Sequence, residues 1–112
     1  MVGVYIGSTA GYSGKNMIAM TLGLRFQKDG YKVGYMKPVG AMPKEIDGKL
    51  VDEDAFFVQE ILGLSEDAEK VTPVVVNQDF KVKAFKGEYE NLMDKIQQNY
   101  AELSQDKDVM IV

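Results

Sequence analysis

The sequence has no cysteine, no histidine and no tryptophan among its 112 residues, and it has only three prolines. Without cysteine, the chain can form neither disulfides nor thiolate nucleophiles. Without histidine, it has no imidazole general base, no Ser-His triad and no histidine metal ligand. The groups left for chemistry are carboxylates, lysines, hydroxyls and backbone amides. These groups are suited to positioning and charge stabilisation, which is how proteins catalyse phosphoryl transfer.

Long apolar runs and an excess of positive charge are also missing. No stretch approaches the length of a membrane span, and no basic segment precedes an apolar one at the start, as in a signal peptide. The net charge of −4 argues against a general binder of nucleic acids or membrane surfaces. We therefore predict a cytoplasmic protein that binds neither nucleic acid nor membranes.

The most informative segment that is present runs from Gly7 to Asn16 and is rich in glycine. It follows an apolar run at 2–6 and precedes a helical pattern from Met17 to Phe26. A strand, a glycine loop ending in Gly-Lys, and a helix form the context of a phosphate-binding loop. Glycines let the backbone approach a ligand closely, and the helix adds the positive end of its dipole.

This loop predicts a nucleotide-phosphate site formed by Gly11, Tyr12, Ser13, Gly14, Lys15 and Asn16. Lys15 would reach the terminal phosphates as a mobile positive charge. The next position usually holds Ser or Thr, whose hydroxyl binds Mg²⁺. Here it holds Asn16, whose amide oxygen can also ligate a hard cation. A glycine-rich turn with a surface lysine is the alternative, but the agreement of strand, loop and helix favours the phosphate site.

The spacing of apolar residues predicts the remaining elements. It indicates helices at 15–29, from Asp52 or Glu53 to 62, and at 86–104, with strands at 2–6, 31–36 and 108–112. We expect a polar loop at 41–51 and an extended edge or connecting segment at 71–76, which contains Pro73. This alternation predicts an α/β fold, a P-loop NTPase-like three-layer α/β/α domain with a mostly parallel sheet.

The last predicted strand, 108–112, is apolar and stops with the chain. Termini are usually polar and frayed, and in phosphate-loop proteins such a strand leads into an acidic residue near Mg²⁺. We therefore expect residues 1–112 to be a single P-loop domain, truncated at its C-terminus as the N-terminal fragment of a longer polypeptide. A short protein whose last strand is simply a core strand is the alternative.

Three segments together resemble the dethiobiotin synthetase-like family of P-loop proteins: 7–15, 34–40 and 52–55. The resemblance is strongest to the version found as the N-terminal domain of phosphotransacetylase-like proteins, and it extends to the cobyrinic acid a,c-diamide synthase group. It covers essentially the whole chain. The Lys-Pro-Val piece in the second segment and the acidic-Asp-Ala piece in the third make it more specific than a glycine loop alone.

The resemblance implies roles for individual residues and the cofactors ATP and Mg²⁺. Gly11, Gly14 and Lys15 match the loop that wraps the nucleotide phosphates. Lys37 matches a lysine that points toward phosphate or substrate, and Asp54 matches an acidic residue that helps to hold Mg²⁺. Asn16 stands where the family normally has Thr. From the residues alone, Lys37 could equally be an ordinary exposed lysine. The other two acids of the 52–54 run are better explained as favourable charges at a helix N-terminus.

Two functions of different class follow. In the first, Mg-ATP binds and a phosphoryl group moves to a carboxylate-type acceptor, while Lys15 and Lys37 stabilise the developing charge. In the second, a regulatory module senses a nucleotide or phosphorylated ligand for a C-terminal partner domain without turnover. Asn16 and the missing acidic end of the last strand favour the second, while the family scaffold favours the first for an intact ancestor. Asn16, and Thr9-Ala10 where the family has an Asp-Thr pair, are departures that put synthetase activity in doubt. A folded remnant that binds nothing tightly is a third alternative. The family also implies a homodimer.

Overall fold

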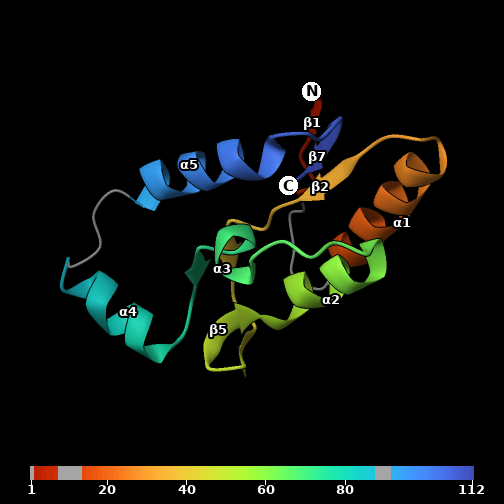
Figure 1. The fold of residues 1–112 in the computed structure, drawn as a ribbon. Helices are drawn as coiled ribbons and strands as arrows, with labels where there is room; N and C mark the ends of the chain where they lie inside the picture. The colour runs from red at the N-terminus through yellow and green to blue at the C-terminus, as the bar shows by residue number, and fades with distance from the viewer. Residues whose placement is uncertain (1, 8–13, 88–91) are drawn as a thin grey trace.

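The structure is a computed structural model that describes residues 2–7, 14–87 and 92–112. Figure 1 shows its elements, which run in the order β1 (Val2–Val4), α1 (Lys15–Lys28), β2 (Val33–Tyr35), β3 (Val39–Gly40), β4 (Pro43–Ile46), β5 (Lys49–Asp52), α2 (Glu53–Leu62), α3 (Ala68–Val71), β6 (Val74–Val75), α4 (Gln78–Phe85), α5 (Leu92–Ser104) and β7 (Val109–Ile111). None of the helices in these described ranges is long and apolar enough to cross a membrane.

The central sheet has three parallel strands in the order β1-β7-β2. All residues of β2 and β7 are buried, as expected for covered strands of a parallel sheet, whereas β1 at one edge of the sheet is mostly exposed. The apolar run at 2–6 therefore does not form a buried strand. Helices α1 and α2 pack together on one side of this sheet, and α5 lies on the other (Figure 1). The predicted α/β fold with a parallel sheet is therefore confirmed.

The helices predicted at 15–29 and from Asp52 or Glu53 to 62 are confirmed as α1 and α2. Local interactions explain where they begin and end. Helix α1 ends at Lys28 and is followed by Gly30 with a φ of 90°. Helix α2 begins after Asp52, whose carboxylate accepts a hydrogen bond from the Ala55 N–H at 2.9 Å. It ends at Leu62 and is capped by Gly63, where a φ of 69° favours glycine.

The predicted loop at 41–51 is wrong, because this segment contains an antiparallel β-hairpin. Strands β4 and β5 pair from Pro43 opposite Asp52 to Ile46 opposite Lys49. The turn between them, Asp47-Gly48, has positive φ at both residues, 51° and 78°. An Asp-Gly turn of this kind matches the twist of paired strands, so the hairpin forms although half of its strand residues are charged.

Two further predictions need correction. Helix α5 begins at Leu92 in the described residues, while Lys86 and Gly87 form the C-terminal cap of α4, so the predicted helical start at 86 is wrong. The segment 71–76 is only partly extended: Val71 ends α3, and β6 pairs in parallel with β3. Helices α3 and α4 were not predicted, because each is short. Helix α4 also has no buried residue to mark a face.

Candidate functional site

Helix α1 begins at the end of the glycine-rich segment. Gly14 is its N-cap, with a φ of 84° and a ψ of 17°, and its carbonyl accepts a hydrogen bond from the Ile18 N–H at 3.0 Å. This left-handed conformation strongly favours glycine. Lys15 and Asn16 therefore occupy the first turn, where helical N–H groups lack intrahelical acceptors and the dipole is positive.

The carboxyl ends of the three parallel strands meet beside this helical turn. Beyond the strands, the Ile6 N–H donates to the Val112 carbonyl, and the Met36 N–H donates to the Ile111 carbonyl, both at 2.9 Å. These bonds hold the ends of the strands together. Ligands of open α/β sheets bind outside this edge.

A pocket of about 300 Å³ lies at this edge. It is lined by Tyr5, Ile6, Lys15, Asn16, Ala19, Tyr35, Met36, Lys37, Pro38, Val39 and Val112. The first turn of α1 thus faces the same space as the segment that follows β2. The structure brings together Lys15, Asn16 and Lys37, three of the residues that the sequence singled out.

Lys37 lies beside two carboxylates. Its Nζ is 3.1 Å from Oδ2 of Asp52 and 4.0 Å from Oδ2 of Asp54. The Asp52 side chain is fully buried, whereas those of Lys37 and Asp54 are 28% and 40% exposed. Asp52 therefore does more than supply a favourable charge at a helix N-terminus, and the sequence interpretation of that residue was incomplete.

Tyr35 also lines the pocket, at the end of β2. Burial raises the pKa of its phenol above the ordinary value of 10, and the carboxylates of Asp52 and Asp54 raise that pKa further. A phenol in this setting stays neutral and keeps its O–H as a hydrogen-bond donor. Tyr35 could not be selected from the sequence, because only the folded chain places it near these acids.

The Tyr35 pKa predicts a loss of stability in alkali. Tyrosine in an unfolded chain titrates near pH 10, while the folded protein holds the Tyr35 proton more tightly. The free energy of unfolding should therefore fall as the pH rises above about 10. In Tyr35→Phe this fall should be shallower, as measured by urea denaturation at a series of alkaline pH values. Identical slopes in the two proteins would contradict the assignment.

The remaining predicted site residues are only partly placed. Gly11, Tyr12 and Ser13 lie outside the described residues. Asp54, a predicted Mg²⁺ ligand, lies beside Lys37, while Asn16, the other, lines the pocket. Within residues 2–7, 14–87 and 92–112, no group of three or more acidic side chains could hold a metal ion.

Comparison with known proteins shows the family to which the chain belongs. The family model described as "AAA domain" matches residues 2–112. The ATP-dependent dethiobiotin synthetase BioD of Clostridium acetobutylicum is 37% identical over 75 residues, which make up 67% of this chain and 31% of that protein. The match thus spans less than a third of the length of this relative. The chain belongs to the AAA domain family, as a P-loop domain related to dethiobiotin synthetase, and nucleotide binding is implied at the level of that family.

Proposed function

We propose that this domain binds ATP together with Mg²⁺ in the pocket at the carboxyl edge of the central sheet. The observation that carries the proposal is the convergence of Lys15 and Asn16, from the first turn of α1, with Lys37, from the end of β2. Two lysines and the N-terminus of a helix are the groups that proteins use to bind phosphates. The match to an ATP-dependent relative supports ATP as the nucleotide.

The charges around the pocket indicate that binding depends on a metal ion. The positive charges of Lys15 and Lys37 are balanced by the two carboxylates beside Lys37, so these four side chains carry no net charge. A triphosphate therefore needs a further cation. The amide oxygen of Asn16 and the carboxylate of Asp54 are hard oxygen donors of the kind that Mg²⁺ accepts, with phosphates and water completing its shell. Mg²⁺ would supply neutralisation of the phosphate charge.

In a longer protein, the same arrangement would support phosphoryl transfer from ATP to a carboxylate-type acceptor. Lys15 and Lys37 would stabilise negative charge as it develops on the transferring group. Tyr35, held neutral, would donate a hydrogen bond into the pocket. The acceptor would bind at the open side of the pocket, next to Lys37.

A non-catalytic nucleotide sensor is the second candidate, and a specific observation favours it. The position that normally supplies a hydroxyl to Mg²⁺ holds Asn16. In addition, Lys37 is paired with a buried carboxylate and is not a free cation. ATP hydrolysis or transfer by the full-length protein, abolished by Lys15→Ala, would decide for the enzyme. Tight binding of ATP without turnover would show that the domain is a non-catalytic sensor.

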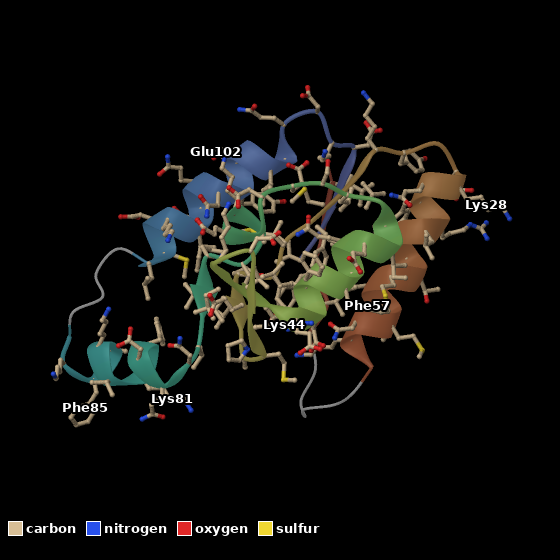
Figure 2. The ribbon with its side chains drawn as sticks, turned by 60° about the horizontal axis from the view of Figure 1, so that its bottom comes forward. Lys28, Lys44, Phe57, Lys81, Phe85 and Glu102 are labelled. Carbon is tan, nitrogen blue, oxygen red and sulfur yellow. The ribbon has the colours of Figure 1, made fainter. Side chains whose placement is uncertain are left out.

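Calorimetry with ATP, ADP and GTP, with and without Mg²⁺, tests the binding proposal. Lys15→Ala should weaken Mg-ATP binding about 10- to 100-fold, since one charge-assisted contact to phosphate is lost. Lys28→Ala is a matched control, because Lys28 is at the opposite end of α1 and points into solvent (Figure 2). No binding at millimolar nucleotide, or equal affinity in wild type and Lys15→Ala, would refute the proposal.

A further inference from the structure

The ammonium group of Lys37 needs a partner to hold it at the pocket. A lysine side chain has four flexible methylenes and loses about 2 kcal/mol of rotamer entropy when it is fixed. The Lys37 backbone is held, because its N–H donates to the Val71 carbonyl at 2.9 Å. Its Nζ is held by the 3.1 Å hydrogen bond to Asp52 Oδ2. The orientation of the charge therefore depends on Asp52.

Asp52 is itself rigidly fixed. Its Oδ1 accepts a hydrogen bond from the Met42 N–H at 3.0 Å, and its Oδ2 accepts one from the Ala55 N–H at 2.9 Å. In addition, the Glu53 N–H donates to the Met42 carbonyl at 2.8 Å, which joins the start of α2 to the segment before β4. The carboxylate is thus held by the hairpin and by the helix at once, and it is fully buried.

Gly40 leaves the room that this carboxylate needs. A Cβ added at Gly40 would lie 2.5 Å from Asp52 Oδ1 and 2.6 Å from its Cγ. The φ of Gly40 is outside the left-handed region, so glycine is required here for space and not for backbone conformation. β3 and the Asp52 carboxylate are therefore packed directly against each other.

Capping of α2 alone does not explain a buried charge at this position. Asparagine caps a helix about as well as aspartate, and in this protein Asn77 caps α4 by accepting from the Phe80 N–H at 2.8 Å. Burying a carboxylate costs far more than burying an amide unless the charge is paired. The negative charge of Asp52 is therefore explained by its ion pair with Lys37.

We propose that Asp52 is a positioning residue of the nucleotide site, which holds the Lys37 ammonium at the pocket so that it meets a bound phosphate in a fixed orientation. This inference rests on the proposed nucleotide-binding function. Asp52 acts through Lys37 and does not itself contact the ligand, since its side chain is fully buried and is absent from the lining of the pocket.

The first test is made on the ligand-free protein. Lysine NH₃⁺ signals are recorded by NMR in wild type, in Asp52→Asn and in Asp67→Asn, with Lys37→Met to assign the Lys37 signal. Asp67 is the matched control, because it caps α3 and lies at the surface. Exchange of the Lys37 protons with water should become about tenfold faster in Asp52→Asn, because the negative charge that holds the ammonium is removed even where the amide oxygen still accepts its hydrogen bond. An unchanged Lys37 signal would overturn the proposal.

The second test is a double-mutant cycle on Mg-ATP affinity, measured by calorimetry. Asp52→Asn should weaken binding several-fold in the wild-type background and have no effect in the Lys37→Met background, because its effect passes through that lysine. If Asp52→Asn weakened Mg-ATP binding equally in both backgrounds, the role of Asp52 would be merely structural. If the wild type binds no Mg-ATP, the proposed function fails, while the NMR measurement still decides whether Asp52 positions Lys37.

Gly40→Ala provides a second variant if Asp52→Asn does not fold, as judged by circular dichroism. It displaces the carboxylate without changing any charge. The Lys37 protons should again exchange faster with water, and Mg-ATP affinity should fall in the same direction. A folded Gly40→Ala protein with an unchanged Lys37 signal would count against the proposal.

Discussion

Met110→Ala is expected to lower the free energy of unfolding by about 2–5 kcal/mol, the range measured for truncation of large buried side chains. Met110 is fully buried in the middle of the central strand β7. Its register partners on the two flanking strands are Gly3 and Gly34. These neighbours have no side chains that could move into the cavity. The loss should therefore fall in the upper half of this range.

Met93→Ala is the matched control for this substitution. Met93 lies in α5 and is 64% exposed, so its truncation should change stability by no more than about 0.5 kcal/mol. Urea denaturation gives both values, provided that the slope of the transition is the same in each protein. Similar losses in the two variants would show that the Met110 side chain does not fill the core as described.

The parts of the fold that could be predicted are those with strong local signals. Helix α2 buries one face, at Ala55, Val58 and Leu62, and a glycine precedes α1 and follows α2. Strands β2 and β7 are short apolar runs whose residues are all buried. In these segments, local preference and tertiary packing favour the same structure, so the sequence is sufficient.

The β4–β5 hairpin was missed for a physical reason. Its exposed strand residues include Lys44 and Glu45, and its burial is confined to the end of β5, at Val51 and Asp52. No alternation of apolar residues marks such strands. The local signal that could have identified it is the Asp47-Gly48 pair, because Asp-Gly is a preferred sequence for a two-residue hairpin turn.

Helix α4 is a second element that sequence periodicity could not reveal. None of its residues is buried, and Phe85 near its end is 93% exposed and points away from the rest of the molecule (Figure 2). A helix without a buried face leaves no apolar stripe in the sequence. Its one clear signal is the N-cap Asn77, whose side chain accepts from the Phe80 N–H.

Some residues of the candidate site could likewise be predicted from the sequence, and others could not. Lys15, Asn16 and Lys37 could be assigned to one place, because the carboxyl ends of parallel strands meet at one edge of the sheet. Asp52 could not, because its contact with Lys37 depends on the hairpin, which brings Met42 and β5 back to the end of β2. The error in predicting the hairpin therefore also concealed the partner of the lysine.

Asp52→Ala is expected to lower the free energy of unfolding by about 3 kcal/mol. The substitution removes the acceptor of three hydrogen bonds, from the Met42 N–H, the Ala55 N–H and the Lys37 ammonium. Breaking a buried ion pair by removing one partner costs about 3–5 kcal/mol. The lower end applies here, because the Lys37 side chain is 28% exposed and its charge can turn toward water.

Two further variants separate the parts of this loss in chemical denaturation at neutral pH. Asp67→Ala removes a surface N-cap and should cost about 1 kcal/mol. The loss of unfolding free energy in Asp52→Asn should lie between the losses in Asp52→Ala and Asp67→Ala. The asparagine amide oxygen can still accept from Ala55, but its NH₂ group would face the Met42 N–H, a buried mismatch that costs about 1–3 kcal/mol. If Asp52→Ala were no more costly than Asp67→Ala, the buried carboxylate would contribute a helix cap and nothing more, and Lys37 would be held by other means.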